Sequence, residues 1–320
     1  MSNFKFSILV TGGTQGMGVE CVRSLAQQLP DTLIVTSART DPKDSATLIN
    51  KQLNQTNVQF QRLDLSSLAA VRTFVETWST SNRPPLRALV LNAGIQFPDD
   101  IQYSTDGIEK TFAINHVGHA LLFHLLTPHL TPTARIVITS SGVHDHDLKG
   151  GFKPTWPSVQ EIANPSPSFS TSTSGRTRYA ISKLANVLWT YALARRLTAQ
   201  GQGKTVVTFD PGLMPGTNLA RDAGPVLRFL WYVVMPRAIP LLRRVYHPNV
   251  HTPRESGETL AWLAVGEECK AENGVYYEGR RVVGSSRDSR DEGKQEGLWE
   301  WTVGFVGRDE GERGAFGRLE

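Results

Sequence analysis

The sequence has too few cysteines for a disulfide framework and too little net charge for an electrostatic partner. Only Cys21 and Cys269 are present among 320 residues, and their spacing does not suit a metal ion. We therefore expect a reducing, cytoplasmic environment. The 34 basic and 30 acidic side chains leave a net charge of +4, scattered along the chain. This pattern argues against a nucleic-acid partner, which needs a concentrated basic surface.

Long apolar runs and internal repeats are also missing. A strand-like run begins almost at once, at 6–10, without the charged start and long apolar stretch of a signal peptide. The most apolar stretch, 229–235, is too short to span a bilayer and is followed by Pro236, Arg237 and Pro240. A length of 320 residues fits one large α/β domain with insertions.

What the sequence does contain is a regular alternation of strand-like and helical patterns. Apolar β-type runs recur at 6–10, 33–36, 58–60, 88–91, 136–139, 206–209 and 275–277. Helical patterns separate most of them, which predicts a doubly wound, Rossmann-type parallel sheet with helices on both faces. Ligands of such sheets bind beyond the carboxyl ends of the strands. We expect the polar and glycine residues that follow these runs to converge at that edge.

A glycine-rich turn, Thr11-Gly12-Gly13-Thr14-Gln15-Gly16-Met17-Gly18, follows the first of these runs. A helical pattern comes directly after it, at 19–26. Strand, glycine turn and helix together are the context of a dinucleotide-binding site. Glycine lets the backbone approach a pyrophosphate closely, and the helix start offers N–H groups and a positive dipole end. The alternative is a tight turn without a ligand.

Tyr179 and Lys183 stand four residues apart, which places them one turn apart on one face of a helix. A phenol has a reference pKa near ~10 and is a poor base at neutral pH unaided. A neighbouring ammonium group favours the phenolate and lowers that pKa. The pair therefore predicts a proton donor and acceptor. The alternative is an ordinary solvated helix face.

These elements resemble the short-chain dehydrogenase/reductase family over most of the chain. The family's motifs match, in order, Thr11-Gly12 with Gly16-Met17-Gly18, Asn92-Ala93-Gly94, Asn115, Ser141, Tyr179 with Lys183, and Pro211-Gly212. Three stretches, 115–119, 182–188 and 211–219, resemble the branch that holds retinol dehydrogenases and light-dependent protochlorophyllide reductase. The resemblance implies an oxidoreductase that uses a nicotinamide cofactor.

Four residues would carry the chemistry if the resemblance holds. Ser141 would hydrogen-bond the substrate carbonyl oxygen, and Tyr179 would exchange a proton with it. Lys183 would bind the nicotinamide ribose and lower the pKa of Tyr179. Asn115 would hold a water that links Lys183 to solvent, or it would make a purely structural bond inside its helix.

The resemblance also implies a cofactor-binding set: Gly12, Thr14, Gln15, Gly16, Met17, Gly18, Arg39, Asp64, Leu65, Asn92, Ala93, Gly94, Tyr179, Lys183, Pro211, Gly212 and Thr217. Arg39 follows the second strand, where NAD-selective members carry an acid nearby, and its guanidinium suits the extra phosphate of NADP(H). Its alternative is a surface arginine. Asp64 would receive the adenine amino group or act as a turn acid beside Ser66. Thr217 stands one place beyond the common family position, which is Gly216.

Two segments interrupt the alternation of strands and helices. The first, 142–178, is rich in Ser, Thr, Pro and Gly and is predicted to border the substrate. The second, 218–253, is predicted to form a lid over it, and docking on a membrane surface is its alternative use. We expect residues 1–303 to form the domain and the glycine-rich tail, 304–320, to be loosely ordered.

The leading hypothesis is thus an NADP-dependent enzyme acting on a carbonyl or alcohol of an apolar, bulky small molecule. A non-catalytic NADP-binding scaffold is the alternative from another class. Light-driven ring reduction is disfavoured, because the lid has no cysteine, which the light-dependent enzymes use there. We expect no metal site, since the pair His116 and His119 belongs to a family motif and the cluster around His144 lies in a polar loop. Substrate identity, reaction direction and oligomeric state are not readable from the sequence.

Overall fold

The computed structural model describes residues 4–97, 100–148, 151–201, 203–217, 224–269 and 272–320, and its centre is an eight-stranded sheet. The strand order is β3-β2-β1-β4-β5-β6-β7-β8, and every neighbouring pair is parallel except β7 with β8. The bounds are β1 Phe6–Thr11, β2 Thr32–Ala38, β3 Val58–Arg62, β4 Leu86–Leu91, β5 Leu130–Thr139, β6 Thr205–Asp210, β7 Val275–Glu278 and β8 Arg281–Val282. The predicted doubly wound α/β fold is confirmed, with β8 as an added edge strand.

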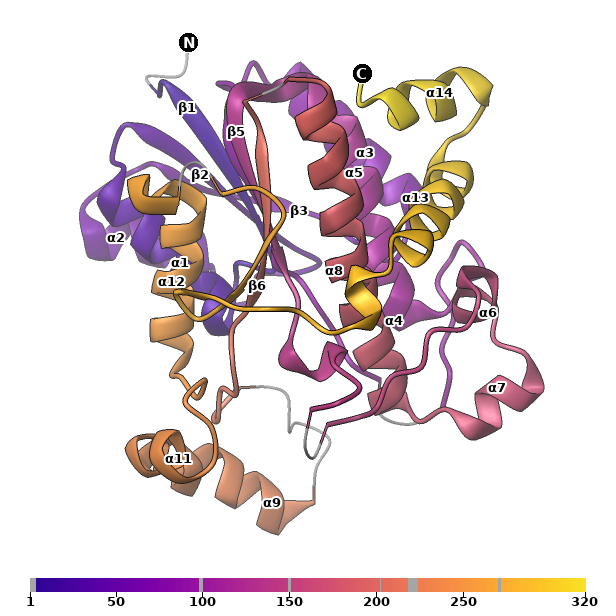
Figure 1. Ribbon diagram of the computed structural model, residues 1–320. Coiled ribbons are helices and arrows are strands. Elements are labelled where there is room, and N and C mark those ends of the chain that lie inside the picture. The colour runs from indigo at the N-terminus through magenta and orange to yellow at the C-terminus, as the bar shows by residue number, and fades with distance from the viewer. Residues whose placement is uncertain (1–3, 98–99, 149–150, 202, 218–223, 270–271) are drawn as a thin grey trace.

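Helices cover both faces of the sheet, as Figure 1 shows. One layer contains α1 (Gly16–Gln28), α2 (Ser45–Leu53) and α12 (Pro253–Val265). The other contains α3 (Leu68–Thr80), α4 (Lys110–Phe112), the π-helical turn η1 (Ala113–Val117), α5 (Gly118–Leu126) and α8 (Gly175–Ala199). Outside α8 lie α13 (Glu292–Val306) and α14 (Glu310–Arg318). Short 3₁₀ turns are η2 (Thr127–His129), η3 (Gly142–His144), η6 (Glu267–Cys269) and η7 (Asp288–Arg290).

The central strands are apolar throughout because both of their faces are buried. In β1, Leu9 packs into the core under α3, α5 and α8, whereas Ile8 and Val10 pack into the core under α1 and α12. Neighbouring residues of a strand point to opposite faces, so one run of sequence serves both cores. Packing on both faces fixes β1 between its neighbouring strands, and it therefore also fixes the position of the glycine turn at the carboxyl end of β1.

The chain crosses the middle of the sheet between β3 and β4. β1 pairs with β2 on one side and with β4 on the other, so the carboxyl ends of β1 and β4 lie together. Open α/β sheets bind ligands in the crevice at such a switch point. The fold therefore brings the glycine turn beside Asn92, Ala93 and Gly94.

The two predicted substrate segments carry short helices. Segment 142–178 contains α6 (Val159–Ala163) and α7 (Pro167–Ser172). The lid contains α9 (Pro225–Phe229), the π-helical turn η5 (Leu230–Val234), α10 (Met235–Arg237) and α11 (Ile239–Val245). In Figure 1 these lid helices lie below the carboxyl ends of the strands. Residues 218–223 of the lid fall outside the described residues.

The tail at 304–320 is ordered, so the prediction of loose order is wrong. α14 buries Phe316, and Glu312 forms an ion pair with Arg72 at 2.6 Å. The Asp309 side chain caps α14 by accepting from the Glu312 N–H at 2.8 Å. The prediction relied on the many glycines of this segment. It overlooked three stabilising features, which are one buried aromatic side chain, one helix cap and one ion pair. No helix among the described residues is long and apolar enough to cross a membrane.

Candidate active site

The glycine turn leaves open space where a cofactor phosphate would approach. A Cβ on Gly18 would stand 2.2 Å from the Gly12 carbonyl oxygen, so only glycine allows this close packing. Gly16 has φ +57, and a Cβ built on it would meet no atom within 4 Å, so this side of the turn is unfilled. α1 starts here without an acidic residue in its first turn. The positive end of the helix therefore faces the open side of the turn, and this arrangement fits a pyrophosphate.

Asn92 and Thr11 join the ends of β4 and β1. The Thr11 hydroxyl oxygen accepts from the backbone N–H groups of Asn92 and Ala93, at 2.9 and 3.0 Å. The Asn92 side-chain amide donates to the Thr11 carbonyl at 2.8 Å. Asn92 thus holds the two strand ends together and leaves the backbone of 93–94 at the border of the crevice.

Tyr179 and Lys183 lie on α8, one turn apart, and face the end of β5. The Lys183 Nζ is 5.5 Å from the centre of the Tyr179 ring and donates to the Thr139 carbonyl at 3.1 Å. A Cβ on Gly94 would be only 3.2 Å from the same Nζ, so this glycine makes room for the ammonium group. The fold thus brings Lys183 to the Asn92–Gly94 turn.

The electrostatics of this pair differ from the sequence expectation. Burial lowers the pKa of Lys183 to about 8, and the nearby Asp210 opposes that change. Burial raises the pKa of the Tyr179 phenol above its usual value, and Asp210 raises it further. Desolvation and this carboxylate therefore outweigh the ammonium group, which was expected to lower the pKa of Tyr179.

Asn115 lies in η1, and its amide is fully engaged as a donor. It donates to the Ile95 carbonyl at 3.0 Å and to the Ser182 hydroxyl at 2.9 Å, while its oxygen accepts from the Ile95 N–H at 2.8 Å. His119 contacts the Asn115 carbonyl through Nδ1 at 3.2 Å and the Thr11 hydroxyl through Nε2 at 2.9 Å. These bonds match the alternative in which the Asn115 side chain has a structural role. Its role in holding a water molecule stays a prediction.

Ser141 is half-buried just beyond β5, and its loop is held by His144. The His144 Nδ1–H donates to the Ser141 carbonyl at 2.8 Å, and its Nε2 accepts from the Ser286 N–H at 3.1 Å. The ring is buried and lies 4.9 Å from the Tyr276 ring. His144 therefore fixes the serine loop, a role that its polar sequence context does not indicate.

The turn after β6 carries Pro211, Gly212 and Thr217. The Thr217 hydroxyl donates to the Met214 carbonyl at 2.9 Å, and the Thr217 carbonyl accepts from the Trp231 indole at 2.8 Å. Thr217 thus ties the turn to the lid. Its contact with a cofactor remains a prediction.

The predicted adenine end of the site is less constrained. Arg39 is exposed directly beyond β2. Asp64 accepts from the Ser66 N–H and hydroxyl through one oxygen, at 2.9 and 2.7 Å, as a turn acid does. Leu65 is buried, with its carbonyl against Gly118.

The histidines of the helix that follows Asn115, His116, His119 and His124, pack in the core. Burial lowers the pKa of His116 and of His124 to about 3. His116 contacts the Thr302 hydroxyl at 3.0 Å, and His124 stacks on Phe316 with ring centres 4.7 Å apart. In the part of the chain that the structure describes, no three His, Cys, Asp or Glu side chains gather into a metal site.

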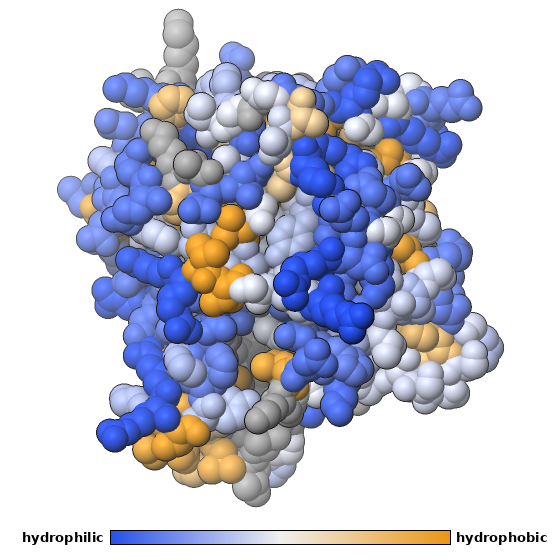
Figure 2. Space-filling model, viewed as in Figure 1, coloured by the Kyte–Doolittle hydropathy of each residue, from blue (hydrophilic) through white to orange (hydrophobic). Residues whose placement is uncertain are grey.

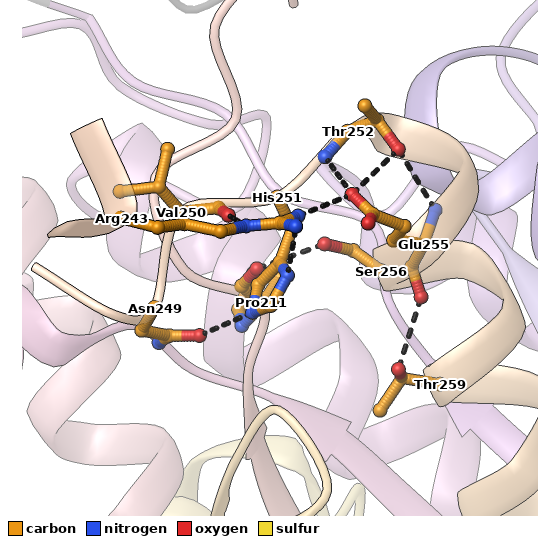
Figure 3. A network of polar contacts seen from close by, with 9 residues as sticks. All are labelled: Pro211, Arg243, Asn249, Val250, His251, Thr252, Glu255, Ser256 and Thr259. Atoms are coloured by element: carbon orange, nitrogen blue, oxygen red, sulfur yellow. Dashed lines mark hydrogen bonds and ion pairs between the residues drawn. The ribbon is translucent and has the colours of Figure 1, made fainter. Parts of the chain in front are cut away.

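Behind the Pro211–Gly212 turn lies a polar network that sequence reasoning missed (Figure 3). Arg243 of α11 donates to the Val250 carbonyl and to Glu255, both at 2.6 Å. Ser256 of α12 donates to the Pro211 carbonyl at 2.8 Å. The network joins the lid to the turn. The capping-box spacing of Thr252 and Glu255 could have indicated one part of it, but the contacts that Arg243 and Ser256 make join separate elements and carry no local sequence signal.

Comparisons with known proteins identify the family of this chain. The family described as short chain dehydrogenase matches residues 7–151, and the AcuH dehydrogenase domain matches residues 220–316. Polyprenol dehydrogenase of Danio rerio is 32% identical over 93% of this chain and 86% of its own. Retinol dehydrogenase 12 of Homo sapiens is 30% identical, with 94% and 86% covered. Protochlorophyllide reductase of Daucus carota is 28% identical, with 95% and 78% covered.

Solved structures share the fold. An uncharacterized protein from Mycobacterium Paratuberculosis matches with a TM-score of 0.65 and 26% identity over 95% of this chain and 94% of that one. A blue fluorescent protein from a metagenomic library, solved with NADPH, matches with a TM-score of 0.61 and 23% identity, over 87% and 99%. Fold, motifs and relatives agree, and this chain belongs to the short-chain dehydrogenase/reductase family, in the branch of the retinol dehydrogenases and protochlorophyllide reductase.

Proposed function

We propose that this oxidoreductase moves a hydride between NADP(H) and a carbonyl or alcohol of an apolar, bulky substrate. The observation that carries the proposal is that Lys183, which lies beside the Tyr179 ring, meets Gly94 of the Asn92–Gly94 turn at the carboxyl edge of the sheet. Ser141 lies two residues beyond β5, and Lys183 binds the carbonyl of the last residue of that strand, so we expect a substrate oxygen bound here to lie between the Ser141 and Tyr179 hydroxyls. An open glycine turn for the pyrophosphate completes the arrangement.

The chain's own residues would handle the proton. In reduction, Ser141 donates a hydrogen bond to the carbonyl oxygen, and the Tyr179 hydroxyl gives that oxygen its proton. In oxidation, the phenolate takes the proton back. When bound, the nicotinamide ring supplies or receives the hydride. Lys183 is buried, and its ammonium group donates to the Thr139 carbonyl. From this position we expect it to bind the nicotinamide ribose. We also expect its charge, together with the positive ring of the oxidised cofactor when bound, to lower the pKa of Tyr179 and so favour the phenolate.

The preference for NADP(H) over NAD(H) rests on Arg39. Its guanidinium is exposed beyond β2, at the end of the site where the adenosine ribose would lie. A planar guanidinium binds a phosphate through paired hydrogen bonds. Asp64 is the proposed partner of the adenine amino group, through the carboxylate oxygen that does not bind Ser66.

The lid supports an apolar substrate. Its helices expose several large apolar side chains: Phe229, Leu230, Val233, Val234, Leu241, Val245 and Tyr246. Figure 2 shows hydrophobic surface at the foot of the molecule, where these helices lie. Residues 223–254 also hold five arginines and no acidic residue. This combination suits a lid that also rests on an anionic membrane, from which an apolar substrate could enter a cytoplasmic enzyme.

The test is turnover of NADPH and NADH with a panel of apolar ketones, aldehydes and quinones, for the wild type and Tyr179→Phe. The proposal predicts turnover with NADPH that the substitution abolishes. Tight NADPH binding without turnover on any substrate class would favour the scaffold alternative. Equal turnover by the two proteins would remove Tyr179 from the mechanism.

A further inference from the structure

Asp210 is a buried carboxylate at the end of β6 that none of the proposed steps uses. Its Oδ1 accepts from the Gly212 N–H at 3.0 Å, and its Oδ2 accepts from the Asn249 side-chain amide at 2.9 Å. The backbone of Gly142 lies against the same carboxylate, and its N–H lowers the pKa of that carboxyl. A Cβ on Gly142 would stand 3.0 Å from Oδ2, so the serine loop presses directly on this group.

Three segments that border the proposed reaction centre therefore meet at one side chain. Gly142 follows Ser141, Gly212 belongs to the turn proposed to border the nicotinamide, and Asn249 lies at the base of the lid. Asp210 makes no ion pair within the described parts of the chain, and burial raises the pKa of its carboxyl to about 6. Burying a carboxylate without an ion pair is costly, so the Gly212 N–H and the Asn249 amide must hold it firmly.

Asn249 is itself held from behind (Figure 3). The His251 Nε2 lies 3.0 Å from the Asn249 side-chain oxygen, and the His251 Nδ1 lies 3.4 Å from Nη2 of Arg243. Because Arg243 can only donate, Nδ1 accepts and Nε2 carries the proton. This tautomer points the Asn249 amide hydrogens at Asp210. The hydrogen bonds thus run in one direction, from the Arg243 cation of α11 to the Asp210 anion, and such chains polarise cooperatively.

The backbone repeats the connection. The Leu213 N–H donates to the Asn249 carbonyl, and the His251 N–H donates to the Leu213 carbonyl, both at 2.9 Å. Residues 249–251 therefore run alongside the turn as a short added ladder, so movement of α11 is transmitted to the turn and to Asp210.

We propose that Asp210 is a positioning residue that fixes the Ser141 loop relative to the Pro211–Gly212 turn and couples both to the lid through Asn249, His251 and Arg243. The alignment of the substrate oxygen with the nicotinamide depends on that separation. The inference rests on the proposed function for its effect on turnover. Its effect on cofactor binding can be measured separately.

The test is a residue swap. Asp210→Asn keeps the shape of the side chain, but its new amide group points hydrogens at a neighbouring donor, either the Gly212 N–H or the Asn249 side-chain amide. We expect kcat to fall about tenfold with little change in substrate KM, and the NADPH Kd to rise about threefold. In the double variant Asp210→Asn/Asn249→Asp, the amide at 210 donates to the carboxylate at 249, while the acceptor for His251 is kept. Here kcat and Kd should return to within about threefold of wild type. Glu312→Gln, which weakens the distant pair with Arg72, is the matched control and should leave kcat and Kd unchanged.

Three results would overturn the proposal. One is wild-type kcat and NADPH Kd in Asp210→Asn. The second is a double variant that melts like wild type yet recovers neither quantity. If Asp210→Asn does not fold, His251→Phe breaks the chain of bonds further away and should lower kcat about threefold. An unchanged kcat in His251→Phe is the third result that would overturn the proposal. If the wild type binds NADPH but turns over nothing, the proposed function fails, and the Kd series alone decides the role of Asp210.

Discussion

The sheet and the lid of this protein use apolar side chains in opposite ways. Ile8, Leu9 and Val10 of β1 are fully buried, and both faces of that strand are covered. In the lid, Leu241 is 61% exposed and Val245 is 68% exposed. The first region satisfies its apolar surface within the chain. The second leaves that surface exposed, and we infer that substrate or lipid covers it.

The same contrast appears in how the elements are held. Ser174 and Thr252 cap α8 and α12, whereas α1 and α2 begin without a side-chain cap and are held on the sheet by packing. The lid turns η5, α10 and α11 have none, and the lid is tied down by polar contacts such as Trp231 to Thr217 and Arg243 to Glu255. A region held by a few polar contacts can open at low cost, whereas one held by packing cannot. We therefore expect chemistry and stability to depend on the sheet, and access to depend on the lid.

The largest effect should come from Tyr179→Phe, which removes one hydroxyl from the fixed region. We expect kcat to fall roughly 10²–10⁴-fold, the range that positioned proton transfer contributes, while the NADPH Kd changes little. Steady-state kinetics with fluorescence titration of NADPH measure both. If turnover persisted at the wild-type level, the contrast between a catalytic sheet edge and an access lid would lose its basis.

Gly18→Val should break the glycine turn. The new Cβ would stand 2.2 Å from the Gly12 carbonyl, so the turn must shift, at a cost of about 1–3 kcal/mol in stability together with loss of NADPH binding. Gly304→Ala in α13 is the control, because a Cβ there meets nothing within 4 Å and should stabilise the helix by about 0.5–1 kcal/mol. Urea unfolding and NADPH titration separate the two. Unimpaired NADPH binding by Gly18→Val would show that the close approach is unnecessary.

Acid should destabilise the core, because its buried histidines resist protonation. Burial lowers the pKa of His124 to about 3, so between pH 6.5 and 3 the unfolded chain binds a proton that the folded chain refuses. Stability should therefore fall as pH drops below 6.5, by up to about 2 kcal/mol per such histidine at pH 5. In the His124→Phe variant, the free energy of unfolding measured with urea should depend less steeply on pH than in the wild type. An unchanged pH slope would mean that His124 is protonated in the fold.

Arg39→Ala should remove most of the cofactor preference. We expect the wild type to bind NADPH about tenfold more tightly than NADH, which is about 1.4 kcal/mol. The variant should bind both cofactors about equally, because only the extra phosphate engages the guanidinium. Isothermal titration with both cofactors tests this, with Arg254→Ala as an exposed-arginine control. A wild type without preference would place Arg39 outside the site.

The smallest effect on stability, and the sharpest test of the lid, should come from Leu241→Ser with Val245→Ser. Both side chains are exposed, so the free energy of unfolding should change by less than about 0.5 kcal/mol. Flotation of the variant with anionic vesicles should nevertheless drop, and the same substitutions should raise the KM for apolar substrates.

Hydrogen exchange of the wild type tests the lid in a second way. Exchange in 224–246 should be fast in the free protein and slower with cofactor and substrate. Wild-type flotation by the variant, or slow exchange in every state, would make the lid ordinary fixed structure.

The extent of sequence prediction follows the same division between packing and polar contacts. The alternation of strands and helices predicted the sheet, because each strand is buried on both faces and reads as a short apolar run. The Tyr179 and Lys183 pair was predictable from a spacing of one helical turn. Asp210, Asn249 and His144 were not, because their partners come from distant elements and each residue type is common in turns. The raised pKa of Tyr179 depends on burial and on Asp210, and neither can be read from local sequence.

The position of α14 has a consequence for synthesis on the ribosome. Phe316 covers His124, and Glu312 pairs with Arg72, so the last helix completes a core that begins with α3 and α5. While α14 is still inside the exit tunnel, the aromatic surface around His124 stays uncovered in the emerging chain. Domains fold as units once their sequence has emerged, and uncovered apolar surface in partly folded chains promotes aggregation. A stalled or truncated chain lacking α14 should therefore be a good substrate for chaperones.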